Sequence, residues 1–118
     1  MSKRNWIILF EDLHSSIEKI ESYIKGLSEN DFFSNQMIID AVVRNIEIIG
    51  EIAKQIPVSI MDKIPEIPWK ALSGIRNRIV HEYFNVDVSI IWQIVTKDLP
   101  ELKLNLRKLL DNNPHLKF

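Results

Sequence analysis

The chain has 118 residues, with 15 basic side chains, 16 acidic side chains and no cysteine. This length fits one domain of ordinary size, and a net charge of −1 excludes a uniformly basic nucleic-acid coat or a polybasic membrane binder. The lack of cysteine excludes disulfide scaffolds, thiolate zinc sites and cysteine nucleophiles, and is compatible with the reducing cytoplasm, where we expect the protein.

Apolar residues recur every three or four positions, which is the spacing of amphipathic helices. The first stripe ends just before Gly26, a residue suited to a helix C-terminus. It consists of Trp6, Leu9, Leu13, Ile17, Ile20 and Ile24. Its apolar run at residues 6–10 is too short to span a membrane, so we expect no membrane partner. In the polar stretch that follows, Phe32 and Phe33 are expected to fold back onto the bundle.

The second stripe occupies residues 38–56 and is stopped by Pro57. A third helix is predicted to begin near Pro68. The N–H groups in the first turn of a helix have no partner within the helix, so a proline, which has no N–H, is well suited to that turn. Residues 85–87 form the next turn, and Asp87 is the predicted N-cap of a fourth helix.

Pro100 lies within the fourth apolar stripe, which runs from Ile91 to Leu109. The stripe keeps its phase across the proline, which favours one kinked helix over a new helix capped by the pattern Asp98-x-x-Glu101. The sequence therefore predicts an all-α, up-and-down four-helix bundle with a possible short extra helix, formed by residues 1–118 as a single domain.

The predicted third helix has an unusual charge distribution. From residue 70 to residue 81 its charged side chains are Lys70, Arg76 and Arg78, and the first acid is Glu82. Arg76 and His81 are five residues apart, so their directions on a helix diverge by about 140°. Three features could bring the two side chains together. They are the length of the arginine side chain, fraying of the helix end near residue 85, and a second copy of the chain across a two-fold axis.

These residue types support RNA cleavage by the ribose 2′-hydroxyl, which needs no metal ion. His81 would take the hydroxyl proton as general base, and Arg76 would neutralise charge on the phosphoryl oxygens. Asn77, four residues before His81, would orient the imidazole or hold a phosphate oxygen, while Lys70 and Arg78 would bind RNA. No metal-ligand spacing or glycine-rich phosphate loop occurs, so we expect neither metal nor cofactor.

A structural interpretation of the same residues stays open. Arg76 would then pair with a carboxylate of the second helix, Arg78 would be a surface residue, and Tyr83 would sit at the edge of the core.

A charged stripe on the second helix also has two interpretations. It consists of Asp40, Arg44, Glu47 and Glu51, which step by four, three and four residues. It is either a solvated face in which Arg44 pairs with Asp40 and Glu47, or the lining of a dimer cleft in which Glu51 positions an arginine of the third helix.

Gly50 and Gly74 lie inside predicted helices, where each costs about 1 kcal/mol relative to alanine. We expect close helix approach at both, and Gly74 would also let RNA or a second subunit come near.

The segment at residues 75–84, IRNRIVHEYF, resembles the R-x4-H-x-Y motif of HepT-like ribonuclease toxins, a branch of the HEPN superfamily. The resemblance covers about residues 41–110, and further matching steps occur at Arg44-Asn45, Gly50-Glu51, Pro68-Trp69, Val86-Asp87, Ile91-Trp92 and residues 98–100.

The resemblance implies a helical bundle that forms a homodimer and brings two motifs together in a cleft. It implies a metal-independent ribonuclease acting as the toxin of a toxin–antitoxin pair, with an MNT-type nucleotidyltransferase as antitoxin. On the matching positions, Arg76 and His81 are the catalytic pair, Asn77 is their polar neighbour, and Tyr83 accepts AMP from the antitoxin. The added phosphate would neutralise the cations needed for RNA.

Two other classes of function remain as alternatives. The chain would be a catalytically silent binding partner or substrate of a nucleotidyltransferase, or a plain helical interaction module.

Overall fold

The computed structural model describes residues 3–62, 65, 67–82 and 88–112, and for residues 3–7, 76–82, 109–110 and 112 it describes the backbone alone. The described chain forms helices and no strand, which confirms the predicted all-α class. The long helices are α1 (Lys3–Ile24), α3 (Gln36–Gln55), α5 (Trp69–Glu82) and a continuous fourth helix made of α6 (Val88–Gln93), η1 (Ile94–Asp98) and α7 (Leu99–Asn112).

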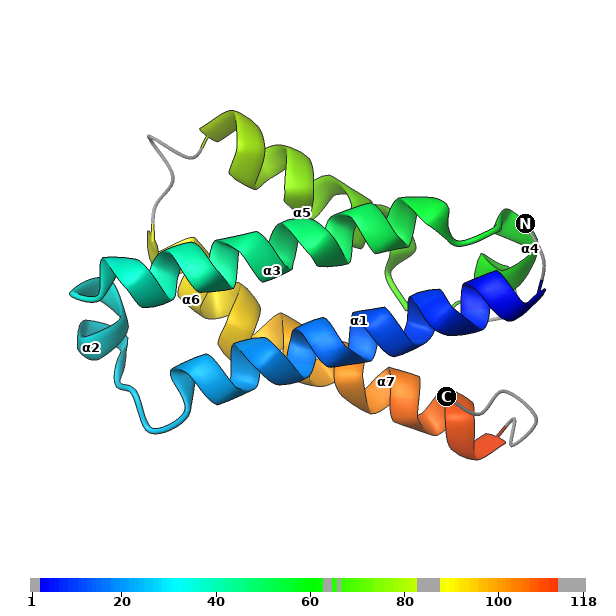
Figure 1. The fold of residues 1–118 in the computed structure, drawn as a ribbon, viewed down its shortest axis with the longest axis horizontal. Coiled ribbons are helices and arrows are strands. Elements are labelled where there is room, and N and C mark those ends of the chain that lie inside the picture. Colours follow the sequence, from blue (N-terminus) through cyan, green and yellow to red (C-terminus); the bar gives the residue numbers. More distant parts are fainter. Residues whose placement is uncertain (1–2, 63–64, 66, 83–87, 113–118) are drawn as a thin grey trace.

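These four long helices alternate in direction, as expected for an up-and-down bundle (Figure 1). Helix α3 packs against both α1 and α5, and the fourth helix crosses behind α1. Two short helices, α2 (Glu29–Phe33) and α4 (Val58–Met61), lie in the connections before and after α3. The predicted bundle is therefore present, with two short extra helices rather than one.

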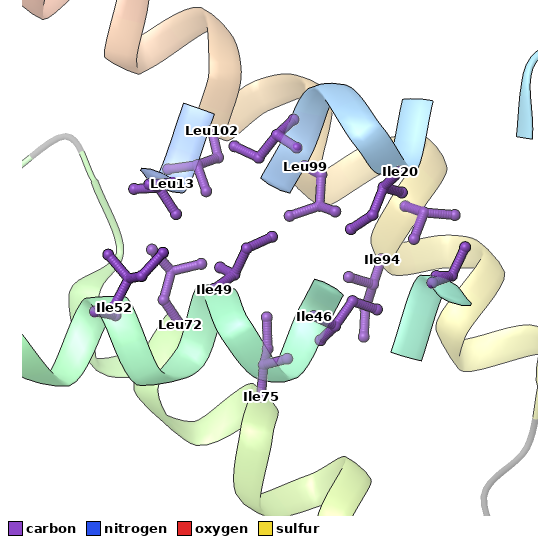
Figure 2. Packing of buried hydrophobic residues seen from close by; sticks show 14 of the residues in the cluster. Leu13, Ile20, Ile46, Ile49, Ile52, Leu72, Ile75, Ile94, Leu99 and Leu102 are labelled. Atoms are coloured by element: carbon purple, nitrogen blue, oxygen red, sulfur yellow. The ribbon is translucent and has the colours of Figure 1, made fainter. Parts of the chain in front are cut away.

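The core forms where the apolar stripes of the long helices meet. Helix α1 contributes Phe10, Leu13, Ile17 and Ile20, each at most 1% exposed. Side chains from α3, α5 and the fourth helix surround them, and Ile49, Leu72 and Leu99 are among those that meet at the centre of the cluster in Figure 2. Within the described residues, no helix is both long and apolar enough to cross a membrane.

The connection between α1 and α3 shows which sequence signals decided the local structure. Gly26 has φ +78°, which confirms it as the left-handed residue that ends α1. Ser28 begins α2 with a capping box, in which its hydroxyl accepts from the Asp31 N–H and its own N–H donates to the Asp31 carboxylate. Phe32 is buried against Trp92, with ring centroids 5.1 Å apart, whereas Phe33 is 41% exposed. The prediction for Phe33 is wrong, because neighbouring residues of a helix point about 100° apart and one of the pair must face outward.

The fourth helix passes through Pro100 without a break. Residues 94–98 form a π-helical turn, in which the Leu99 N–H donates to the Ile94 carbonyl five residues earlier. A proline in an α-helix clashes with the carbonyl four residues before it and offers no N–H to that carbonyl, so the wider turn accommodates Pro100. The helix therefore continues, as the phase of the stripe predicted, and the alternative of a new capped helix at Asp98 is wrong.

Candidate functional site

Helix α5 carries most of the predicted site and is anchored at its first half. It begins directly after Pro68, as predicted, and buries Trp69, Leu72 and Ile75 at steps of three residues. The Trp69 ring packs on Phe10 of α1, with ring centroids 5.9 Å apart. This first half fixes the axis of α5, and so determines the direction in which the second half projects.

The second half of α5 contains the motif residues Arg76, Asn77, Arg78 and His81. Their backbone is helical, so Asn77 and His81 are one turn apart while Arg76 and His81 point about 140° apart around the axis. Their side chains lie outside the described part of the structure, and so does the whole of Tyr83. The predicted N-cap Asp87 also lies outside it.

The end of α5 that bears the motif lies at the same end of the molecule as α2 and the beginning of α3 (Figure 1). Helices α5 and α3 pack against each other and run in opposite directions, so the end of α5 is on the side of the beginning of α3. In Figure 1 this half of α5 also diverges from α3 toward the edge of the molecule. The motif therefore lies on the outer helix of the bundle and not in its centre.

The first turn of α5 places Lys70 on the surface, where its side chain is exposed. Gly74, one turn later, has space beside it, because a Cβ atom added there would meet no described heavy atom within 4 Å. Close packing against the described residues therefore does not explain this glycine, and that prediction is corrected for this part of the chain. Gly50, by contrast, is buried in α3.

The charged stripe of α3 lies mainly on the surface. Arg44 is exposed and forms no ion pair with Asp40, Glu47 or any other described carboxylate, so the predicted pairs are absent. Asp40 instead accepts a hydrogen bond from Gln36, whose Nε2 lies 2.8 Å from Asp40 Oδ1. Glu47 is half-buried and Glu51 is exposed.

Asn45, next to Arg44, is a buried polar residue whose environment the sequence did not reveal. It is 6% exposed, and its Nδ2 donates to the Ala41 carbonyl at 2.9 Å. A polar residue in the middle of an otherwise apolar stripe was the available signal, because a buried amide needs a hydrogen-bond partner. Among the described residues, no group of three or more His, Cys, Asp or Glu side chains is placed to hold a metal ion.

Comparison with known proteins identifies the family. The model of the family described as "Ribonuclease HepT-like" matches residues 13–109. The chain belongs to the HepT-like ribonuclease family. The match includes the motif at residues 76–83, and it begins inside α1, so the family relationship extends further toward the N-terminus than the motifs in the sequence indicated.

Three relatives are similar in sequence to this HepT-like chain over most of its length. A Thermococcus cleftensis protein named "Probable ribonuclease HepT" is 38% identical over 91% of this chain and 97% of its own length. A Methanocaldococcus jannaschii "Putative RNase" is 38% identical over 87% of this chain and 94% of its own length.

A second protein of that organism, named "Gamma-glutamylcyclotransferase and putative RNase", is 40% identical over 94% of this chain. This chain spans about half (51%) of the length of that relative. No solved structure matches the chain.

Proposed function

We propose that this HepT-like chain is a metal-independent endoribonuclease, the toxin of a HepT/MNT-type toxin–antitoxin pair. The observation that carries the proposal is the family match over residues 13–109, which includes the complete R-x4-H-x-Y motif. Family membership supports the ribonuclease and its RNA substrate. The backbone of α5 is helical from Trp69 to Glu82, so Arg76 and His81 lie on one helix.

In the proposed reaction, neutral His81 removes the proton from a ribose 2′-hydroxyl. The 2′-oxygen forms a bond to the adjacent phosphorus, and the bond from phosphorus to the 5′-oxygen breaks. The departing 5′-oxygen takes a proton from water, and His81 returns its proton to the solvent. The products are a 2′,3′-cyclic phosphate and a 5′-hydroxyl, so no metal or cofactor enters the balance. Arg76 stabilises the charge on the phosphoryl oxygens, Asn77 orients the imidazole or a phosphate oxygen, and Lys70 and Arg78 hold the RNA backbone.

A homodimer is part of the proposal because one helix points Arg76 and His81 in different directions. The exposed Arg44, the half-buried Glu47 and the exposed Glu51 of α3 are proposed as supporting residues of the dimer cleft. Residues 1–118 would act as one HEPN/HepT-like helical domain, in the cytoplasm.

The proposed antitoxin is an MNT-type nucleotidyltransferase that transfers AMP to Tyr83. The tyrosine oxygen attacks the α-phosphorus of ATP, pyrophosphate leaves, and the hydroxyl proton is lost. The modified Tyr83 carries the negative charge of a phosphate, seven residues after Arg76 and five residues after Arg78. The added nucleotide would block the cleft by its bulk, and its charge would repel RNA.

The first test is cleavage of labelled RNA by unmodified protein in excess EDTA, with intact mass confirming that Tyr83 carries no AMP. Wild type should cleave and leave cyclic phosphate ends, whereas His81→Ala should lose about 10²–10⁴-fold in rate, the usual contribution of a general base. His14→Ala is the matched control, because His14 lies on α1 and contacts Glu18, with Nδ1 2.9 Å from Oε1.

Equal cleavage by wild type and His81→Ala would reject His81 as the base. No cleavage of any RNA by unmodified wild type would favour the catalytically silent nucleotidyltransferase partner. In that case, AMP transfer to Tyr83 should occur in the presence of the antitoxin without any RNA cleavage.

A further inference from the structure

Helix α3 has a charged face that its two neighbours leave uncovered. In Figure 1, α1 and α5 pack on opposite sides of α3. The uncovered face carries Asp40, Arg44, Glu51 and Lys54, which are all exposed and point within about 80° of one another around the helix. Neither Arg44 nor Lys54 forms an ion pair with a described carboxylate.

The order of these four charges along α3 is complementary to itself. Read from the beginning of the helix, the charges are negative, positive, negative and positive, with Asp40 and Lys54 outside and Arg44 and Glu51 inside. Both pairs are centred near residue 47, and the two members of a pair point within about 40° of each other. If a second α3 packs antiparallel on this face, Arg44 of each copy meets Glu51 of the other, and Asp40 meets Lys54. Such a contact occurs twice, as in any isologous interface.

Apolar side chains extend the same face. Met37, seven residues before Arg44, points about 20° from it and is 80% exposed. Ile48 is half-buried and lies close to the centre of the charge pattern. Glu47, the other acid near that centre, is half-buried and points about 60° from Arg44, at the edge of the face. Burial of Met37 and Ile48 would supply the hydrophobic contribution, and the charges would fix the register of the two helices.

We infer that this face of α3 is where two copies of the chain pack, antiparallel and around a two-fold axis near residues 47–48. The inference rests on the proposed dimeric ribonuclease and specifies the contact between its copies. A two-fold axis between antiparallel helices leaves the neighbours of each helix on the same side, so both α5 helices lie on one side of the α3 pair. The motif half of α5 lies toward the first half of α3, so the two motifs border one groove over this pair.

Reversal of charge tests the contact through the oligomeric state of the full chain, measured by analytical ultracentrifugation without RNA. Wild type should be a dimer. Arg44→Glu and Glu51→Arg each replace two attractive contacts per dimer with two repulsive ones, so the dissociation constant should rise about 100-fold or more. The double variant Arg44→Glu with Glu51→Arg restores opposite charges at both contacts and should return the dissociation constant close to that of wild type.

A mixture of the two single variants tests the register directly. One copy then carries acids at positions 44 and 51 and the other carries arginines, so heterodimers should form although neither variant dimerises alone. Native mass spectrometry would detect them, and circular dichroism would confirm that each variant is folded.

Two controls match the charge and the apolar contribution. Lys19→Glu makes the same change of charge on the exposed surface of α1 and should leave the dimer intact. Met37→Gln should weaken the dimer, whereas Leu104→Gln, at a 52% exposed position on α7, should not.

A monomeric wild type would overturn the inference. So would a dimer that survives both single reversals, because the copies would then meet through another face, or a folded double variant that stays monomeric. None of these measurements depends on RNA cleavage. A wild type that dimerises through this face and cleaves no RNA would reject the proposed ribonuclease and leave the interface in place.

Discussion

Gly74→Ala should stabilise this protein, which is unusual for a substitution in a helix of a natural domain. Gly74 lies inside α5, its φ is not positive, and an added Cβ would meet no described atom within 4 Å. Alanine therefore adds helix propensity without a steric cost. We expect the free energy of unfolding to rise by about 0.5–1 kcal/mol.

For a chain of 118 residues, this gain corresponds to a rise of about 2–4 °C in the melting temperature. Thermal unfolding followed by circular dichroism would measure it. Gly26→Ala is the matched control, because Gly26 has φ +78° and any L-residue there costs about 1–2 kcal/mol. The control should melt below wild type, and Gly74→Ala should melt above it.

A lower melting temperature for Gly74→Ala would refute the conclusion that this side of α5 is open. RNA cleavage by the same variant carries separate information. Increased stability with reduced cleavage would show that RNA or a second copy approaches the backbone at Gly74, because no contact within the described chain requires a glycine there.

Two further substitutions test the core and the proposed RNA-binding face. Leu106→Ala should cost about 2–5 kcal/mol in urea unfolding, because Leu106 is fully buried in α7, whereas Leu104→Ala at a 52% exposed position should change stability by less than about 0.5 kcal/mol. Similar losses for both would contradict the assigned core. RNA affinity measured by fluorescence anisotropy should fall as salt rises, and Lys70→Gln should reduce the slope of log affinity against log salt by about one for each copy that binds. Affinity that does not depend on salt would contradict the proposed cationic contact.

The long helices were predictable because each buries a continuous stripe, and the spacing of a stripe is visible in the sequence. Phe10, Leu13, Ile17 and Ile20 of α1 show the limit of this inference. The predicted stripe of α1 included Leu9 and left out Phe10, since the angular boundary of a buried face is set by the neighbouring helices. Those neighbours are known only from the tertiary structure.

The π-helical turn before Pro100 was beyond prediction for a different reason. A π-turn changes which carbonyl each N–H contacts, and the apolar spacing on either side stays nearly the same. The pattern Asp98-x-x-Glu101 fits a capping box in the sequence, yet in the structure one continuous helix runs through both residues. A local pattern identifies residues that can cap a helix, and the backbone decides whether a helix begins there.

The motif shows the same division between local and tertiary information. Four residues of the motif lie on α5, and their spacing along that helix follows from the sequence alone. Whether Arg76 and His81 act on one phosphate depends on what lies opposite them, because they point about 140° apart. Helical periodicity contains no information about a second copy of the chain.

Mixing two inactive variants would decide whether the proposed site is shared between copies. If Arg76 of one copy acts with His81 of the other, a dimer of Arg76→Ala with His81→Ala contains one intact site and one doubly defective site. After free exchange about half of the dimers are mixed, so the mixture should recover roughly one-quarter of wild-type cleavage, although each variant alone is inactive. Differently tagged variants and native mass spectrometry would confirm that mixed dimers form. Inactive mixed dimers would place Arg76 and His81 of a site in the same copy, and a monomeric protein would remove the dimer cleft from the mechanism.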